Sequence, residues 1–211
     1  MVGRMSITIR VAVIVVCVAS ISFLPGCGKT ESQGSGPQPS GSSTNPPSVS
    51  RAERGKYLVT ILACTDCHTP LKMGPNGPEH DMSRFLSGHP AGVKLGPVPK
   101  LDPETGWVAA FNSTNTAAAG PWGISYSANL TPSVNGLKVW TEEMFIKAMR
   151  EGKHMGTSRP IMPPMPWPAY GQMTDEDLKS VFAYLQTIPP VDNLVPEYAP
   201  PGDAPDAPFN E

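Results

Sequence analysis

The clearest hydrophobic pattern in the chain lies over residues 174–187. Large apolar side chains recur there at intervals of three and four residues, the spacing of one helix face, at Leu178, Val181, Phe182 and Leu185. Thr174 precedes the pattern as an N-cap, three acidic residues follow it at the positive end of the helix dipole, and Pro189 and Pro190 end it. We therefore predict a core helix over 174–187.

Two further helices follow from the same kind of pattern. Residues 141–151 begin with Thr141 as a cap, end at Gly152, and carry an apolar face made of Met144, Phe145, Ala148 and Met149. Residues 51–63 carry a stripe that we expect to face the core, made of Tyr57, Leu58, Ile61 and Leu62. Gly55 has two explanations: the close approach of another helix, or a tolerated glycine in the first turn.

Regular periodicity fades between residues 69 and 139, where proline and glycine interrupt the chain often. Residues 106–112 and 123–129 have strand character, and a small hairpin would explain both. Residues 191–211 are rich in proline and acid, and they predict an extended, solvated tail. The folded domain is therefore expected over residues 51–190, with a mainly α fold of three or more helices and long Pro- and Gly-rich loops.

The N-terminal segment has the pattern of an export signal. Arg4 and Arg10 precede the apolar run 11–24, which is shorter than the roughly 20 residues of a spanning helix. The run ends Leu-Pro-Gly-Cys, which resembles a bacterial lipobox and implies lipidation of Cys27, a signal peptide over 1–26 and a lipid-anchored protein. An uncleaved anchor and ordinary signal cleavage are the alternatives. The Gly-, Ser- and Pro-rich remainder of 27–50 predicts a flexible linker.

Composition and charge narrow the possible functions. The 211 residues include 26 prolines and 20 glycines, so the packed core is smaller than the length suggests. The formal net charge is -2. A mildly acidic chain lacks the basic face that nucleic acid binding requires, and we expect no nucleic acid partner.

The strongest chemical signal is the motif Cys64-Thr65-Asp66-Cys67-His68. The spacing C-x-x-C-H suits one covalently attached haem c, because the two thiols can each add to one vinyl group while the histidine binds iron. Two alternatives use the same residues. One is a thioredoxin-like redox pair, which requires a preceding strand, and the other is a zinc site of Cys64, Cys67 and two histidines.

A second iron ligand is expected in residues 159–170, RPIMPPMPWPAY. The prolines predict a stiff, non-helical loop close to polyproline II, in which Met162 and Met165 point to the same side. Spacing alone does not choose between these two thioethers. A bis-histidine haem that uses His154 is the rival arrangement; otherwise His80, His89 and His154 are expected to be surface side chains.

Several segments of the chain resemble bacterial periplasmic class I cytochromes c, especially the domains that accompany membrane-linked quinoprotein dehydrogenases. The segments are GKYLVTILACTDCHTP, SANLTP, WTEEMFIKAMREGKH and PPMPWPAYGQMTDEDLKSVFAYLQTIPP. The resemblance implies a class I cytochrome c fold and makes Met165, in the Met-Pro-Trp element, the axial ligand. Many of those subunits carry three C-x-x-C-H motifs, whereas this sequence has one and is therefore similar to a single-haem relative.

The resemblance implies a periplasmic electron carrier rather than an enzyme. A dehydrogenase would donate electrons, and an oxidase or another cytochrome would accept them. The alternative is a haem-based enzyme or sensor with a displaceable axial ligand. Residues expected to contact the haem wall or a propionate are Trp122, Trp167 and Asn129, with Trp140 and Thr131 as further candidates.

Overall fold

The computed structural model describes residues 49–99, 101–102, 104 and 106–201. The predicted signal peptide, Cys27 and nearly all of the predicted linker lie outside these residues. Within the described part of the chain, no helix combines the length and hydrophobicity needed to cross a membrane.

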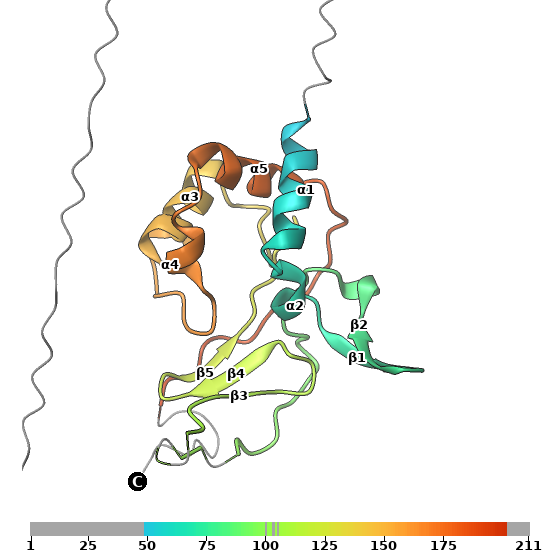
Figure 1. Ribbon diagram of the computed structural model, residues 1–211, viewed down its shortest axis with the longest axis vertical. Helices are drawn as coiled ribbons and strands as arrows, with labels where there is room; N and C mark the ends of the chain where they lie inside the picture. Colours follow the sequence, from blue (N-terminus) through green and yellow to red (C-terminus); the bar gives the residue numbers. More distant parts are fainter. Residues whose placement is uncertain (1–48, 100, 103, 105, 202–211) are drawn as a thin grey trace, which may run out of the picture. The chain divides into compact units, whose positions relative to one another are not determined.

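The described residues form five α-helices, and the strands are few and short (Figure 1). The helices are α1 (Arg51–Ile61), α2 (Cys64–His68), α3 (Glu142–Glu151), α4 (Trp167–Tyr170) and α5 (Asp175–Leu185). The strands are β1 (Leu71–Gly74), β2 (Gly77–His80), β3 (Ala110–Phe111), β4 (Ala117–Gly120) and β5 (Gly123–Tyr126). Two short 3₁₀ turns, η1 (Met82–Arg84) and η3 (His154–Gly156), complete these elements.

Helices α1 and α5 pack against each other at Gly55. A Cβ atom placed on Gly55 would lie 1.9 Å from the carbonyl oxygen of Ser180. Only a residue without a side chain allows this approach. The first explanation for Gly55, the contact with a second helix, is therefore confirmed.

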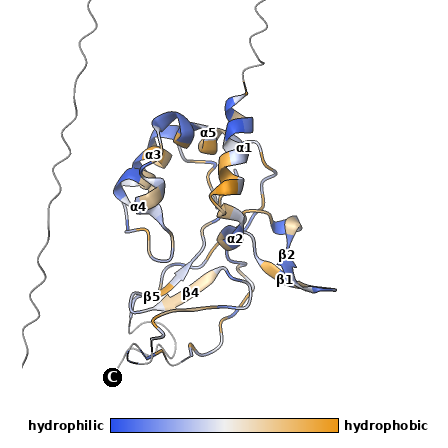
Figure 2. Cartoon of the chain, in the orientation of Figure 1, coloured by the Kyte–Doolittle hydropathy of each residue, from blue (hydrophilic) through white to orange (hydrophobic). Residues whose placement is uncertain are grey.

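The buried face of α1 agrees with the predicted stripe only in part: Leu58 is buried and Leu62 packs against the main hydrophobic core, as expected, but the other two residues are exposed. Leu58 and Val59 are buried beside Gly55, whereas Tyr57 and Ile61 are 55% and 56% exposed. The contact at Gly55 fixes which side of α1 faces α5, and that side is rotated away from Tyr57 and Ile61. Figure 2 shows α1 changing from hydrophilic at its start to hydrophobic near α2.

The predictions for α3 and α5 are confirmed, except that Met144 of α3 is only partly buried and does not belong to the core. The Thr174 hydroxyl accepts a hydrogen bond from the backbone N–H of Asp177 at 3.1 Å, and Thr141 caps α3 in the same way. Gly152 ends α3 in the left-handed region, with φ of 65°. The four predicted apolar residues of α5 are all buried. Together with α1 these helices form the main hydrophobic core.

The sheets correct the predicted hairpin. Residues 123–126 pair as β5 with β4, and β3 pairs with the other edge of β4, so the order is β3-β4-β5. Strand β4 has the sequence AAAG and escaped detection because alanine and glycine lack strand propensity. The separate hairpin β1-β2 was also not predicted, and its tip is hydrophilic (Figure 2).

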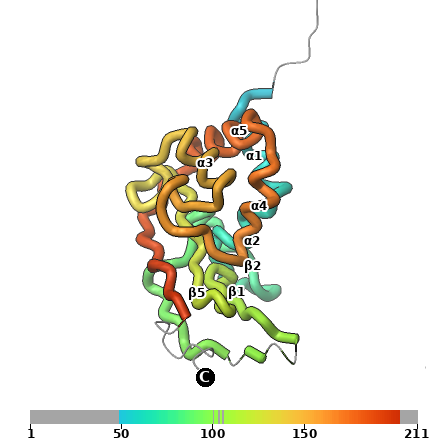
Figure 3. The backbone as a smooth tube through the Cα atoms, turned by 90° about the vertical axis from the view of Figure 1, so that its left-hand side faces the viewer, coloured from blue at the N-terminus to red at the C-terminus, as the bar shows by residue number. Residues whose placement is uncertain are grey.

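The prediction of a solvated tail is wrong for residues 191–201. Asn193 is buried, and its side-chain N–H groups donate to the carbonyl oxygens of Ser87 and His89 at 2.7 and 2.8 Å. Ala199 exchanges two backbone hydrogen bonds with Ile124 of β5. Figure 3 shows this segment, in red, running along the domain beside the green segment near residue 90. Polar backbone and amide contacts hold it, and hydrophobic periodicity does not reveal such contacts.

Candidate functional site

The C-x-x-C-H motif forms helix α2, directly after α1. Ala63 lies between the two helices in the left-handed conformation, with φ of 55°, and this residue ends one helix before the other begins. Cys64 and Cys67 are free thiols. Burial raises the pKa of Cys64 to about 11, and it also raises the pKa of Cys67. A helix precedes the motif, as predicted, and this argues against the thioredoxin-like alternative.

His68 is buried and oriented by a backbone carbonyl. Its Nδ1 lies 2.8 Å from the carbonyl oxygen of Ala128, and because a carbonyl only accepts, Nδ1 carries the proton. Burial lowers the pKa of His68, which favours the neutral ring. The Nε2 lone pair is therefore available to a metal, and the hydrogen bond at Nδ1 is the usual outer contact of a metal-binding imidazole.

Residues 86–89, which sequence reasoning missed, bind the backbone of His68 and the backbone on either side of Ala128. Gly88 N–H donates to the carbonyl oxygen of His68 at 2.8 Å, and His89 N–H donates to that of Ser127 at 2.9 Å. A Cβ on Gly88, whose φ is +75°, would lie 2.4 Å from the Ser127 oxygen. The only available signal was the glycine of Ser-Gly-His, which is too common to identify a site.

Both candidate methionines, Met162 and Met165, line the same cavity as Cys64, Cys67 and His68. Met165 also packs against the main hydrophobic core. The hydroxyl of Ser125 donates to the carbonyl oxygen of Pro163, which attaches the methionine loop to β5.

The expectation that residues 159–170 lack helix is wrong at their end, where Trp167–Tyr170 form the single turn α4. Pro168 is compatible with this turn because the first N–H groups of a helix need no partner inside it.

The cavity has a volume of about 420 Å³, within the range of cofactor pockets. Most of its lining is apolar. Separate parts of the chain contribute to it: α2, β4 and β5, the loop 127–140, helices α3 and α5, residues 154–166, and residues 194–198. An apolar cavity with two thiols, one neutral imidazole and two thioethers fits a covalently attached haem, because these groups suit attachment to the vinyl edge and both axial positions of the iron.

The tryptophans predicted to form the haem wall do not all line the cavity. Trp140 lines the cavity, whereas Trp122 and Trp167 are not among the lining residues. The Trp122 ring lies over Gly120 and the Trp167 ring over Gly152.

Asn129 lines the cavity, but its amide already has protein partners. Its Nδ2 donates to the carbonyl oxygen of Val191 at 2.9 Å, and its Oδ1 accepts from the N–H and the hydroxyl of Thr131. A contact between Asn129 and a propionate stays a prediction.

The three remaining histidines lie in different surroundings. His89 is fully buried, with Nδ1 2.9 Å from the Thr116 hydroxyl, so the expectation of a surface side chain is wrong for it. His154 lines the cavity and meets the Trp140 ring edge-on at 5.2 Å. His80 lies outside the cavity lining, 3.9 Å from an Asp66 carboxylate oxygen. Among the described residues, no group of three His, Cys, Asp or Glu is arranged to hold a metal ion, and the zinc alternative has no such cluster.

The fold and this cavity fit the class of proteins that hold a covalently attached haem in an apolar enclosure. Residues 52–189 match the family described as "Cytochrome c", and the chain belongs to that family. Membership implies covalently bound haem c and electron transfer.

The chain is similar to cytochrome subunits of bacterial dehydrogenases. It is 33% identical over 162 residues to the "Fructose dehydrogenase cytochrome subunit" of Gluconobacter japonicus, which covers 76% of this chain and 25% of the relative. It is 24% identical over 134 residues to the "Alcohol dehydrogenase (quinone), cytochrome c subunit" of Gluconobacter oxydans, covering 63% of this chain and 20% of the relative. The chain thus spans a quarter or less of the length of these two relatives.

Proposed function

We propose that this chain is a single-haem, class I c-type cytochrome that carries one electron at a time between redox proteins. Cys64 and Cys67 would hold the macrocycle, and His68 and Met165 would be the axial ligands, with Met162 as runner-up. When bound, the haem supplies an iron that alternates between the ferric and ferrous forms. The chain's contribution is orientation, exclusion of water and two neutral ligands.

The observation that carries this proposal is the hydrogen bond from His68 to the carbonyl oxygen of Ala128. The bond leaves the second ring nitrogen unprotonated, and two thioethers line the same cavity. A neutral imidazole paired with a thioether raises the reduction potential, which suits a carrier that accepts electrons from a dehydrogenase.

We infer the partners and the location from the relatives and the N-terminal pattern. The relatives are named as cytochrome subunits of dehydrogenases, which supports a membrane-linked dehydrogenase as the donor. An oxidase or a second cytochrome would be the acceptor. The signal pattern and Cys27 support a periplasmic protein anchored by lipid.

The pyridine haemochrome spectrum of protein purified from a host that attaches haem c tests this function. We expect one haem c per chain, removed by replacing both Cys64 and Cys67 with serine. A folded, colourless wild-type protein would contradict the proposal. Palmitate labelling that disappears in Cys27→Ala tests the anchor separately.

The second candidate is a haem-based enzyme or sensor. One observation favours it: His154 lines the same cavity as both methionines and could compete for the iron. Carbon monoxide separates the two functions, because a carrier with both axial positions filled resists binding in the ferrous form at neutral pH. Rapid and complete binding would support the sensor.

A further inference from the structure

The cavity carries very little formal charge. Among its described lining residues, Arg159 is the one lysine or arginine and Glu197 is the one acid. The two form an ion pair, with Arg159 Nε 3.6 Å from a Glu197 carboxylate oxygen. Among the described lining residues, Arg159 therefore carries the one permanent positive charge. The carboxylate that pairs with it comes from the C-terminal segment.

Residues 194–198, which include Glu197, form a wall of the cavity and lie beyond the residues that match the cytochrome c family. The segment is fixed at both ends: Asn193 is bonded to the backbone of Ser87 and His89, and Ala199 is paired with Ile124. In addition, the Tyr198 hydroxyl donates to the carbonyl oxygen of Trp122. Glu197 is therefore held at the cavity by anchored backbone on either side.

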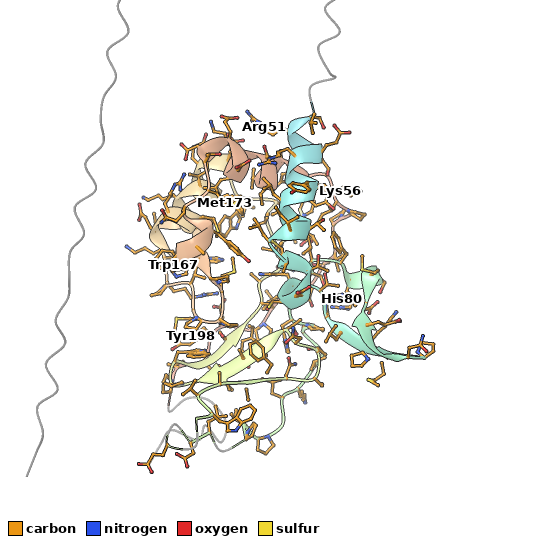
Figure 4. The ribbon with its side chains drawn as sticks, viewed as in Figure 1. Arg51, Lys56, His80, Trp167, Met173 and Tyr198 are labelled. Carbon is orange, nitrogen blue, oxygen red and sulfur yellow. The ribbon has the colours of Figure 1, made fainter. Side chains whose placement is uncertain are left out.

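The position of Glu197 relative to the cysteines can be judged from Tyr198, the next residue in the chain. Figure 4 shows Tyr198, the neighbour of Glu197, on the side of the domain that carries Trp167, apart from α2. In haem the two vinyl groups occupy one half of the macrocycle and the two propionates the other half. When the vinyl groups are fixed at Cys64 and Cys67, the carboxylates therefore point away from α2.

We propose that Arg159 binds a haem propionate and that Glu197 holds the guanidinium at the cavity wall. This inference rests on the proposed attachment of a haem at Cys64 and Cys67. A carboxylate at the edge of an apolar cavity requires a cation, and the planar guanidinium suits it better than an ammonium group. Glu197 is 88% exposed along its side chain, so the present ion pair is weak and Arg159 can turn toward a second carboxylate.

The test is the reduction potential of the haem-loaded protein. Arg159→Gln removes a cation that favours the ferrous form, and we expect the redox equilibrium to move about three- to tenfold toward the ferric form, where tenfold is about 59 mV for one electron. Glu197→Gln should move it less far in the same direction, because Arg159 keeps its charge but loses the carboxylate that holds it at the cavity wall. Arg150→Gln is the matched control, because Arg150 pairs with Asp175 and is not a lining residue.

Nuclear magnetic resonance of the ferrous protein provides the second readout. We expect contacts between the side-chain protons of Arg159 and a propionate methylene group. If Arg159→Gln carries one haem per chain but its potential equals that of Arg150→Gln, this inference fails while the proposed function stands. If the wild-type chain binds no haem, the proposed function fails first, so the two results are distinguishable.

Discussion

The phenolic hydroxyl of Tyr170 donates a hydrogen bond to the carbonyl oxygen of Leu62 at 2.6 Å. Leu62 caps the end of α1, two residues before Cys64, and Tyr170 ends α4, five residues after Met165. One bond therefore joins the segment that would attach the haem to the segment that would supply the second axial ligand. Burial raises the pKa of Tyr170, so the phenol keeps its proton at neutral pH.

Replacing Tyr170 with phenylalanine should loosen the methionine loop. The change leaves a partly buried carbonyl without its donor, which costs about 1–3 kcal/mol. We expect a haem-loaded protein that unfolds at a lower denaturant concentration and that binds carbon monoxide faster in the ferrous form. Tyr57→Phe is the control, because that ring is 55% exposed on α1. Equal carbon monoxide rates in the two variants would show that the bond does not position the loop.

Leucine replacements distinguish the two methionines. Leucine keeps the volume of the side chain but removes the sulfur, so the packing changes little. Met165→Leu should lose the weak absorption band of a methionine-to-iron bond at the red end of the spectrum, whereas Met162→Leu should retain it. The opposite result would assign the ligand to Met162. Absence of the band from the wild-type protein as well would favour a different axial ligand, with His154 as the next candidate.

Gly55→Ala should destabilise the domain without touching the cavity. The added methyl group would overlap the carbonyl of Ser180, and α1 and α5 would have to separate. Overpacking of this kind costs about 1–3 kcal/mol, measurable as a lower midpoint of chemical denaturation. Gly92→Ala is the control, since a Cβ there meets no atom within 4 Å. A Gly55→Ala protein as stable as the control would mean that the helices do not approach as closely as described.

The ion pair between Arg54 and Asp177 should make stability depend on pH. Arg54 Nε lies 2.9 Å from Asp177, and this hydrogen bond lowers the pKa of the carboxyl group. The resulting stabilisation is complete above the pKa of about 3.9 of an unfolded aspartate, and it is lost as the pH falls through the lowered pKa of the folded state. Wild type should therefore be more stable than Asp177→Asn at pH 7, and urea titrations should show the gap closing in acid. A gap that does not change with pH would exclude the ion pair as its cause.

The sequence predicted those parts of the fold that are local. The caps of α3 and α5 and the apolar face of α5 depend on residues within two turns of each other, and all were correct. The predicted face of α1 was right for Leu58 and Leu62 but wrong for Tyr57 and Ile61, because the face is set by Gly55 meeting Ser180, a residue 125 positions away in the sequence. Strand β4 was missed because its alanines form a strand only when β3 and β5 pair with it.

For the site, too, the sequence predicted the local features and missed those that depend on distant parts of the chain. The spacing of Cys64, Cys67 and His68 is a local signal, and the structure places all three at one cavity. The partner of His68 could not be predicted, because a backbone carbonyl such as that of Ala128 carries no mark in the sequence. Residues 194–198 were missed for a related reason, since amide side chains and backbone pairs hold them in place.

The cavity wall formed by residues 194–198 has a consequence for the order of events during synthesis. The thiols of Cys64 and Cys67 emerge from the ribosome more than 120 residues before Tyr198, the last lining residue. Both cysteines are therefore synthesised before the residues that complete the cavity wall. Once Tyr198 has joined β5 through its neighbour Ala199, a porphyrin would have to enter past a completed wall, so attachment is easiest on a chain that has not yet closed.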